Sequence, residues 1–401
     1  MSASASASAS ALAPAPAPVR QTPRQLVLLG GGHAHVKVLA DLADAKQSPL
    51  AGWQLHLVTP YRRQIYSGML PGWIAGHYPI EACAIALDRL AAAAGVQLHQ
   101  TSVNGLDLAA GRVLCADGSA LPFDQLSIDT GPMPALAGLP GSAEFGLSVR
   151  PIEAFIAAWP AVVQRIVAAS GRFELLLLGA GAAGVELAFA IQHRARVEGW
   201  QALRLTLVGH EHLPLDGQPS RLRRRIAALL AQRGIRWLGN RQAERLSTGQ
   251  LHLAQGAPLP FDGCLLATGA AAPAWPAASG LATDERGFIR VGTTLQSLSH
   301  PQVWAAGDVA ALTPPRPKSG VYAVRAGPVL ARNLRAACAG RPPEAWAPQA
   351  RALYLISTGE RHALASWGPW SWGGWGWSGA WVWRWKDHID RQFMRRFGTA
   401  L

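Results

Sequence analysis

The sequence predicts an α/β protein built from two similar three-layer units, each a parallel sheet between helices, followed by a small tryptophan-rich C-terminal region. Three observations predict this fold class. A glycine-rich turn between a strand-like and a helix-like segment occurs twice, at 26–36 and at 175–186. The phrase Phe-Asp…Thr-Gly also occurs twice, at 123–131 and at 261–269. Strand-like and helix-like segments alternate between these landmarks, which is typical of parallel sheets with helices on both faces.

The first turn follows the apolar segment 26–29 and reads GGGHAH from residue 30 to residue 35. Such turns are Rossmann-like. The first glycine permits a left-handed backbone, the second lets the main chain approach a diphosphate, and the third lets helix and strand pack closely. His35 stands where the third glycine belongs. We therefore expect its side chain to lean outward or to widen the gap between helix and strand.

The second turn matches the pattern fully, with Gly179, Gly181 and Gly184 after the apolar segment 175–178. A helix that starts at such a turn offers free N–H groups and a partial positive charge to phosphates. Either turn alone has an alternative interpretation, a glycine-rich connection without a ligand. Two turns of the same build favour two nucleotide-binding units in one chain.

The remaining segments repeat one order. In the first unit we expect helices near 34–45 and 81–94, strands near 54–58, 96–100 and 123–131, and a hairpin over 111–118. In the second we expect helices near 152–168 and 219–233, and strands near 174–178, 203–208 and 261–269. After residue 284 the chain is expected to return to the first unit through a strand near 302–308. Residues 1–23, with their Ser-Ala and Ala-Pro repeats, are expected to form a disordered tail.

The composition indicates which classes of partner the protein can bind. The net charge of +13, from 37 Lys+Arg against 24 Asp+Glu, favours anionic partners such as nucleotide phosphates or lipid. Most arginines between 221 and 245 are interpreted as a solvated helix face, and they lack the interleaved aromatic residues that would indicate nucleic acid.

The four cysteines have no metal-ligand spacing, so we expect buried thiols in a reducing compartment and no metal site. The apolar stretch 175–191 contains three glycines and Glu186, and is therefore read as strand, turn and helix rather than as a membrane span.

These motifs in this order resemble the two-dinucleotide-domain flavoprotein oxidoreductases, the pyridine nucleotide–disulfide oxidoreductase superfamily, over about residues 24–336. Within it, the chain looks most like the quinone-linked branch of type II NADH dehydrogenases and sulfide:quinone reductases. Segments 30–36, 66–72, 317–325 and 383–387 are similar to the oxidoreductase module found fused to selenide, water dikinase.

The resemblance implies FAD and NAD(P)H as cofactors, together with a domain organisation. The FAD-binding domain would be discontinuous, over 24–147 and 285–336. The NAD(P)-binding domain would span 148–284, and a C-terminal interface or membrane-associated region would span 337–401.

The resemblance also implies site residues. Those expected to bind FAD are Gly30, Gly31, Gly32, His33, Thr59, Thr130, Gly131, Gly307 and Asp308. Those expected to bind NAD(P)H are Gly179, Gly181, Gly184, Thr268 and Gly269. Glu186 would lie near the nicotinamide and flavin rings, and Lys318 would stabilise negative charge on reduced flavin or on a quinone. These two are the expected catalytic residues.

Each of these roles has a structural alternative. Glu186 is flanked by apolar residues on a helix, where an unpaired carboxylate is costly, so a buried structural hydrogen bond is the competing explanation. Asp308 suits a helix N-cap, and Lys318 suits an exposed loop. Thr59-Pro60 and Gly209-His210 stand where an acidic residue usually binds a ribose. The choice between NADH and NADPH therefore stays open.

The cysteines decide between chemistries. Segment 61–72, where disulfide reductases of this superfamily carry their cysteine pair, contains none, which excludes a thiol–disulfide relay. Cys83 and Cys338 are expected in helices away from the flavin. The sequence therefore predicts an NAD(P)H dehydrogenase that passes electrons to an acceptor, with a quinone favoured. Oxidation of sulfide, or of a related selenium or sulfur species, is one alternative, and a low-turnover flavin redox sensor or interaction module is another.

Eight of the 16 tryptophans fall within 367–385. A helix over 384–397 would place Trp385, Ile389, Phe393 and Phe397 on one stripe beside basic residues, which resembles a helix lying on a membrane surface. The competing explanation, a helix packed on the protein's own core or in a homodimer, is slightly favoured. We expect a cytoplasmic protein, with peripheral contact to the inner face of a membrane through 367–397 as the alternative, and no nucleic-acid partner.

Overall fold

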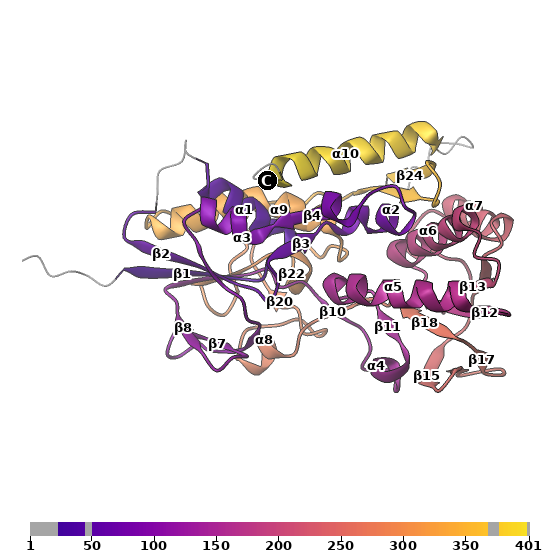
Figure 1. Cartoon of the computed structure of the whole chain (residues 1–401). Coiled ribbons are helices and arrows are strands. Elements are labelled where there is room, and N and C mark those ends of the chain that lie inside the picture. Colours follow the sequence, from indigo (N-terminus) through magenta and orange to yellow (C-terminus); the bar gives the residue numbers. More distant parts are fainter. Residues whose placement is uncertain (1–22, 45–49, 368–376, 399–401) are drawn as a thin grey trace, which may run out of the picture.

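The computed structural model describes residues 23–44, 50–367 and 377–398. It contains two five-stranded sheets side by side, with a long C-terminal helix lying across them (Figure 1). The α/β class predicted from sequence is confirmed. Residues 1–22 of the tail expected at 1–23 lie outside the described residues, as do residues 368–376 of the tryptophan-rich segment.

The first sheet has the order β21-β9-β1-β2-β5, and every neighbouring pair is parallel. Its strands are β1 (Arg24–Leu29), β2 (Trp53–Val58), β5 (Gln97–His99), β9 (Gln125–Ile128) and β21 (Val303–Ala305). Helices α1 (His33–Leu42) and α9 (Gly320–Cys338) pack together on one side (Figure 1). Since β1 is the central strand, the turn after it opens at the carboxyl edge of the sheet, where ligands of such sheets bind.

The second sheet repeats this plan in the order β11-β18-β12-β13-β14. Its strands are β11 (Leu147–Ser148), β12 (Phe173–Leu178), β13 (Leu203–Val208), β14 (Arg236–Leu238) and β18 (Gly263–Leu266). The helices of this unit are α5 (Ile152–Ala168), α6 (Ala182–Glu198) and α7 (Ser220–Gln232). Both central strands are apolar and buried, as strands covered on two faces must be.

Shorter elements fill the connections. Three antiparallel strands, β6 (Val103–Asp107), β7 (Arg112–Cys115) and β8 (Ala120–Pro122), form a small sheet, as do β15 (Ala243–Ser247), β16 (Gln250–Leu253) and β17 (Leu259–Pro260). Two-stranded pairs are β3 (Arg63–Ile65) with β4 (Ala84–Ala86), β10 (Met133–Pro134) with β19 (Ala270–Ala271), and β20 (Ile289–Arg290) with β22 (Ala310–Ala311). Short helices are η1 (Ser67–Met69), α2 (Leu70–Ile74), η2 (Ile80–Cys83), α3 (Leu87–Ala93), α4 (Ser142–Phe145), α8 (Trp275–Ala278) and η3 (Gly307–Val309).

The prediction of a single helix near 81–94 is wrong. The segment folds as η2, β4 and α3, because β4 pairs with β3 some 20 residues earlier in the chain. The hydrogen bond from the Tyr66 amide to the Cys83 carbonyl, 2.8 Å long, continues this pairing. The alanine-rich composition favours a helix locally, and the tertiary pairing overrides it.

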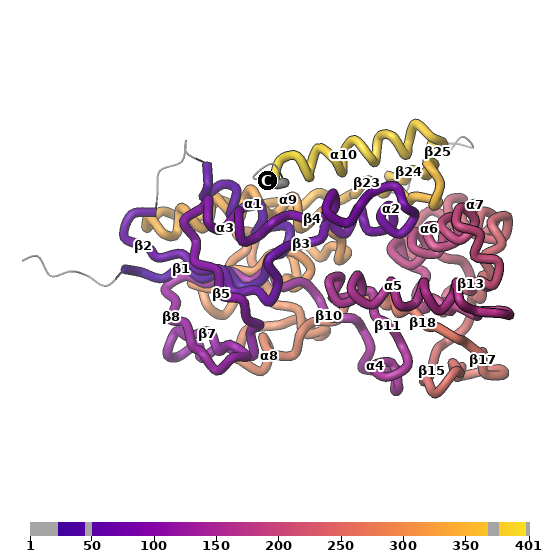
Figure 2. Tube along the Cα trace, viewed as in Figure 1, coloured from indigo at the N-terminus to yellow at the C-terminus, as the bar shows by residue number. Residues whose placement is uncertain are grey.

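The C-terminal region forms a small antiparallel sheet of β23 (Leu353–Ser357), β24 (Ala363–Trp367) and β25 (Ser378–Gly379), followed by α10 (Ala380–Gly398). Figure 2 shows α10, in yellow, running from the second unit back over the first. The helix packs on the protein's own core through Val382, Trp383, Phe393, Met394 and Phe397.

The stripe predicted for this helix is correct only at its end, since Phe393 and Phe397 are buried while Ile389 is 37% exposed. Residues four apart drift by about 40° per step around an α-helix, so one stripe at that spacing cannot stay on one face. Within the described ranges, no helix combines the length and apolar character that crossing a bilayer requires.

Candidate active site

The first glycine turn is closed around the end of β9. Gly30 has a φ of +86°, and a Cβ there would lie 2.5 Å from the Asp129 carbonyl oxygen. The Gly32 amide donates to the same oxygen at 3.1 Å, and a side chain on Gly32 would strike the Asp129 carboxylate. Only glycine fits at these two positions, so the turn has the shape that a close approach of backbone to ligand requires.

From the sequence, the side chain of His35 is expected either to lean outward or to widen the gap between helix and strand. It does not lean outward. The residue is fully buried, its Nδ1 lies 2.6 Å from the Gly30 carbonyl oxygen, and its Nε2 lies 2.8 Å from Ser127 Oγ. Burial lowers the pKa of His35 to about 4, so the ring is neutral. A neutral imidazole can donate from one nitrogen and accept at the other, which satisfies both contacts. The histidine thus ties the helix to the turn at the position where a third glycine would give close packing.

His33, at the first position of α1, carries an unused hydrogen-bonding atom. Its Nδ1 lies 3.2 Å from Gln64 Nε2, whereas its Nε2 is buried without a partner. Burial, reinforced by the charge of Arg150, lowers the pKa of His33 to about 4. Its ring lies against Tyr66 and Phe393. A buried polar atom without a partner is costly, so this one suits a ligand atom at the turn.

Asp308 and Lys318 lie together beyond the end of β21. Asp308, in η3, pairs with Arg150 at 3.4 Å, and Gly307 before it has a φ of +69°. Lys318 Nζ donates to the Ala310 carbonyl at 2.5 Å and lies 3.7 Å from the centre of the Phe288 ring. Burial lowers the pKa of Lys318 to about 8, against the opposing charge of Asp308. The lysine is half-buried rather than an exposed loop residue.

The glycines of the second turn have different structural roles. Gly179 has a φ of +106°, and a Cβ on Gly184 would lie 1.8 Å from the Gly179 carbonyl oxygen, so Gly184 allows helix and strand to pack. Gly181, by contrast, faces open space. Thr268 Oγ1, after β18, is buried without a partner. The turn therefore has a packed side and an open side, as a diphosphate-binding turn needs.

The other predicted residues fall at the ends of strands. Thr130 is exposed, and Gly131 has a φ of +75° with open space beside it, as has Gly269. Thr59 is buried, and its hydroxyl accepts a hydrogen bond from the Tyr61 amide at 3.4 Å. The hydroxyl thus already has a partner within the protein.

Glu186 lies on α6 against the C-terminal region. Its Oε1 accepts a hydrogen bond from the Ser357 amide at 2.9 Å, which is the structural alternative inferred from the sequence. Burial of the carboxylate raises the pKa of Glu186 to about 7, opposed by Lys386 and the Ser357 amide and reinforced by Asp390. Its proton is therefore exchangeable near neutral pH.

Lys386 and Asp390, one turn apart on α10, complete a buried cluster. Lys386 Nζ donates to Asp390 Oδ2 at 2.7 Å and to the Gly68 carbonyl at 2.6 Å. Burial lowers the pKa of Lys386, but Asp390 and Glu186 outweigh it and the net shift is upward. Tyr66 hydrogen-bonds Asp390, and burial raises the pKa of its phenol, so Tyr66 keeps its proton. We call Glu186, Lys386, Asp390 and Tyr66 the Glu186 cluster.

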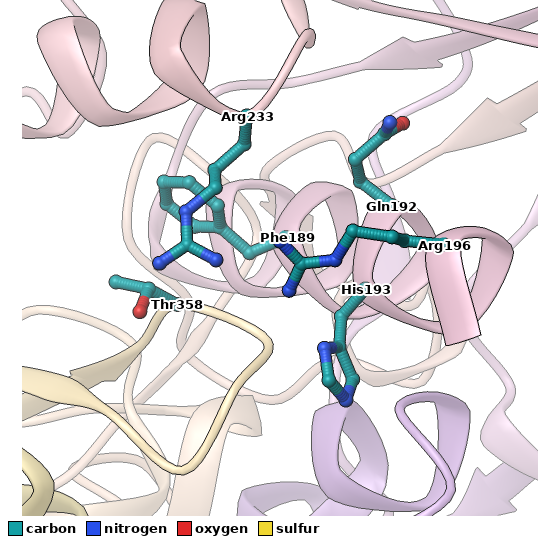
Figure 3. Close-up of a pocket in the computed structure, with 6 residues that line it drawn as sticks. All are labelled: Phe189, Gln192, His193, Arg196, Arg233 and Thr358. Carbon is teal, nitrogen blue, oxygen red and sulfur yellow. The ribbon is translucent and has the colours of Figure 1, made fainter.

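The C-terminal sheet is clamped to α6 where this cluster lies. Arg196 on α6 and Arg233 after α7 both pair with Glu360, and hydrogen bonds from Arg233 and Arg196 lower the pKa of Glu360 to about 2. Figure 3 shows the two guanidinium groups directed into one pocket beside Thr358. A Cβ on Gly359 would lie 2.1 Å from the Phe189 carbonyl oxygen, so the loop passes close over the helix. This contact presents the Ser357 amide to Glu186.

The two predicted catalytic residues have different neighbours in the structure. Lys318 lies with Asp308, whereas Glu186 lies with Lys386. The sequence alone gave no site role to Lys386, Asp129, Asp390 or Tyr66, although Tyr66 and Lys386 lie in the segments 66–72 and 383–387 that carry the family resemblance. A further signal was the spacing of four between Lys386 and Asp390, which favours an ion pair on a helix.

All four cysteines are buried and unpaired. Burial raises the pKa of Cys83, Cys264 and Cys338 to about 12, and that of Cys115 upward as well. A thiol with such a pKa is protonated at neutral pH and is a poor nucleophile. Within the described residues, therefore, the cysteines offer no support for thiol chemistry.

Residues 24–327, well over half of the chain, match the family described as pyridine nucleotide-disulphide oxidoreductase. The chain belongs to this family. The match confirms the resemblance seen in the glycine turns, and FAD and NAD(P)H are its cofactors. The residues fit both groups, because one turn offers the unpartnered His33 Nε2 and the other offers open space at Gly181 beside the unpartnered Thr268 Oγ1.

Named relatives point in the same direction. An NADH dehydrogenase-like protein of Mycobacterium tuberculosis is 26% identical over 245 residues, which cover 58% of this chain and 60% of the relative. The match therefore spans only about three fifths of that relative's length. Demethylphylloquinone reductase NdbB of Synechocystis is 24% identical over 294 residues, covering 71% and 72% of the two chains.

Solved structures show the shared fold. The sulfide:quinone oxidoreductase of Aquifex aeolicus aligns with a TM-score of 0.76 and 17% identity, covering 94% of this chain and 92% of that chain. NDH2 of Plasmodium falciparum, solved in complex with NADH, aligns with a TM-score of 0.74 and 11% identity, covering 94% and 99%.

Proposed function

We propose that the protein is an FAD-dependent NAD(P)H dehydrogenase that passes electrons to a quinone. The observation that carries the proposal is the Glu186 cluster, in which three protonatable side chains surround one lysine. Reduction of a quinone to a quinol consumes two protons as well as two electrons. Glu186, whose carboxyl exchanges its proton near neutral pH, suits that acceptor. The quinone-reducing activity in the name of the NdbB relative adds support.

The two turns would hold the two nucleotides. In this proposal FAD lies at the first turn, with Gly30, Gly31, Gly32, His33, Thr59, Thr130, Gly131, Gly307 and Asp308. NAD(P)H lies at the second, with Gly179, Gly181, Gly184, Thr268 and Gly269. When bound, FAD supplies the hydride chemistry that links a nicotinamide donor to an electron acceptor.

The chain's own residues supply protons and charge. Glu186, with a pKa of about 7, can both release and recover a proton at neutral pH, which is the property of an efficient general acid. Lys386, which donates a hydrogen bond to Asp390, keeps its positive charge beside Glu186 at neutral pH. Lys318 is mostly protonated below about pH 8 and places a positive charge beside Asp308 that offsets negative charge at the FAD site.

The outer face of α10 suits a membrane-soluble acceptor. Trp381 and Ile389 on this helix are 49% and 37% exposed, and Trp377, just before β25, is 46% exposed. Arg384 and Arg396 are exposed on the same helix. Exposed tryptophans beside basic side chains favour the interface of an anionic membrane. We therefore place the protein in the cytoplasm, in peripheral contact with the membrane through α10.

The proposal is tested by anaerobic turnover with a soluble quinone, using NADH, NADPH or sulfide as donor. Wild-type protein is expected to reduce the quinone with a nicotinamide donor. Lys386→Met is expected to slow reoxidation of the reduced protein by the quinone at least about tenfold, with a smaller effect on its reduction.

Lys37→Met, a partly exposed lysine on α1 that does not belong to the Glu186 cluster, is the control and should behave as wild type. Turnover with sulfide alone, or an unaltered quinone step in Lys386→Met, would contradict the proposal.

A further inference from the structure

A carboxylate that the sequence analysis did not single out lies beneath the first turn. Asp129 follows β9 directly and is only 2% exposed. Its Oδ2 accepts hydrogen bonds from the amides of Ala34 at 2.8 Å and His35 at 3.0 Å. Helix α1 is therefore capped by a side chain 95 residues further along the chain. These amides are among the free N–H groups that every helix leaves at its start.

The same carboxylate is held between the two halves of the proposed FAD site. A Cβ on Gly32 would lie 2.2 to 2.3 Å from its atoms, and a Cβ on Gly307 would lie 2.3 Å from its Oδ1. Gly32 belongs to the turn after β1, and Gly307 begins η3 after β21. Asp129 thus sets the spacing between the helix start and the segment that carries Asp308.

The groups that face Asp129 leave its charge poorly compensated. On α1, His33 and His35 are both neutral, since their pKa values lie at about 4. From η3, the nearby charge is that of Asp308, which repels it. Arg150 pairs with Asp308 and also acts on His33, and the charge of Lys318 interacts with that of Asp308. Burial and Asp308 raise the pKa of Asp129 to about 7, against the two amide hydrogen bonds.

We propose that Asp129 is a positioning residue for the FAD diphosphate, and that its carboxyl takes up a proton when the cofactor binds. The proposal rests on FAD binding at the first turn. A diphosphate attracted to the start of α1 adds negative charge close to a carboxylate that shares the same helix end. Like charges at short range favour the neutral acid, so binding and protonation promote each other. The protonated carboxyl keeps an oxygen that accepts the two amide hydrogens.

The test is the pH dependence of FAD affinity, measured by flavin fluorescence with the full-length chain stripped of its flavin. Wild-type affinity is expected to fall by up to about tenfold per pH unit above neutral pH, the limit for uptake of one proton. Asp129→Asn keeps the acceptor oxygen and removes the charge. It is expected to bind FAD with an affinity that lacks the part of this fall caused by Asp129 and that exceeds wild type about tenfold or more at the alkaline end.

Two further variants sharpen the assignment. Asp124→Asn removes a carboxylate at the opposite end of β9, which accepts the Gln25 amide at 2.6 Å, and should keep the wild-type pH dependence. Lys318 also titrates above neutral pH, so the comparison is made in a Lys318→Met background, where that titration is absent. In this background the chain that keeps Asp129 should retain the fall in affinity, and the addition of Asp129→Asn should abolish it. A fall that persists after Asp129→Asn in this background, or that is absent while Asp129 is in place, overturns the proposal.

Calorimetry of the wild type provides a measurement that needs no variant. Heats of FAD binding in two buffers of different ionisation enthalpy should reveal uptake of a fraction of a proton near neutral pH. Equal heats in both buffers refute the proposal while leaving FAD binding intact. Failure to bind FAD at any pH would overturn the cofactor assignment and this inference together.

Discussion

Replacing Glu186 by glutamine should stabilise the protein, by a gain that grows between about pH 4.5 and about pH 7 and stays constant above that. The folded state holds the proton of Glu186 until about pH 7, whereas an unfolded chain releases it near 4.5. Between these values the folded state binds more protons than the unfolded state, so the free energy of unfolding falls as pH rises. Glutamine has no proton to release and still offers an oxygen to the Ser357 amide.

The size of the effect follows from the raised pKa. A shift from 4.5 to about 7 is worth about 3 kcal/mol when the carboxyl is fully ionised in both states, at about 1.4 kcal/mol per pKa unit. At about pH 5 the Glu186 carboxyl is already mostly ionised in the unfolded chain. The gain between about pH 5 and about pH 8.5 is therefore smaller, about 2.5 kcal/mol. Glu186 is half-buried rather than fully enclosed, which reduces the expected gain to about 2 kcal/mol.

The assay is urea unfolding of the full chain at both pH values, with equal flavin content in each sample. Glu186→Gln should match wild type within about 0.5 to 1 kcal/mol near pH 5 and exceed it by about 2 kcal/mol more near pH 8.5. Glu198→Gln, on the same helix and paired with Arg194 at the surface, is the control and should show no such divergence. Equal differences from wild type at the two pH values would show that Glu186 does not hold its proton in the folded state.

Two other predictions concern the second turn and the outer face of α10. Gly184→Ala places a Cβ against the Gly179 carbonyl, so it should lower the free energy of unfolding by about 1 to 3 kcal/mol in thermal or urea unfolding. Gly181→Ala faces open space and should leave stability unchanged while weakening NAD(P)H binding roughly tenfold or more; the reverse pattern would contradict the roles assigned to these glycines. Replacing Trp377 and Trp381 together by serine should reduce sedimentation with anionic vesicles several-fold without altering quinone turnover in solution, and unchanged sedimentation would remove α10 from the membrane contact.

Much of the fold could be predicted because its landmarks are local. A strand, a glycine turn and a helix occupy about 20 consecutive residues, and the backbone of Gly30 and Gly179 demands glycine whatever lies around them. The central strands β1 and β12 are apolar because each is covered on both faces of its sheet. Where the local pattern conflicts with a distant pairing, as in β4, the prediction from sequence is wrong.

The site could be predicted only in part, because its decisive contacts join residues far apart in the chain. The Glu186 cluster connects α6 to α10 across 200 residues of sequence, and nothing near Glu186 indicates Lys386. Asp129 meets the start of α1 because β9 and β1 are neighbours in the sheet, an order that the sequence does not state. The inward position of His35, which contradicts the first of its two expected outcomes, has the same origin, since its partner Ser127 lies on β9.

Anaerobic reduction of the flavin by a nicotinamide nucleotide tests the central claim most directly, because it requires both glycine turns to bind their nucleotides and to bring them together. The purified protein, loaded with FAD and mixed with NADH or NADPH without oxygen, should lose its visible flavin absorbance within the time of mixing and observation. Full retention of that absorbance with both donors, in protein that has bound FAD, would contradict the account.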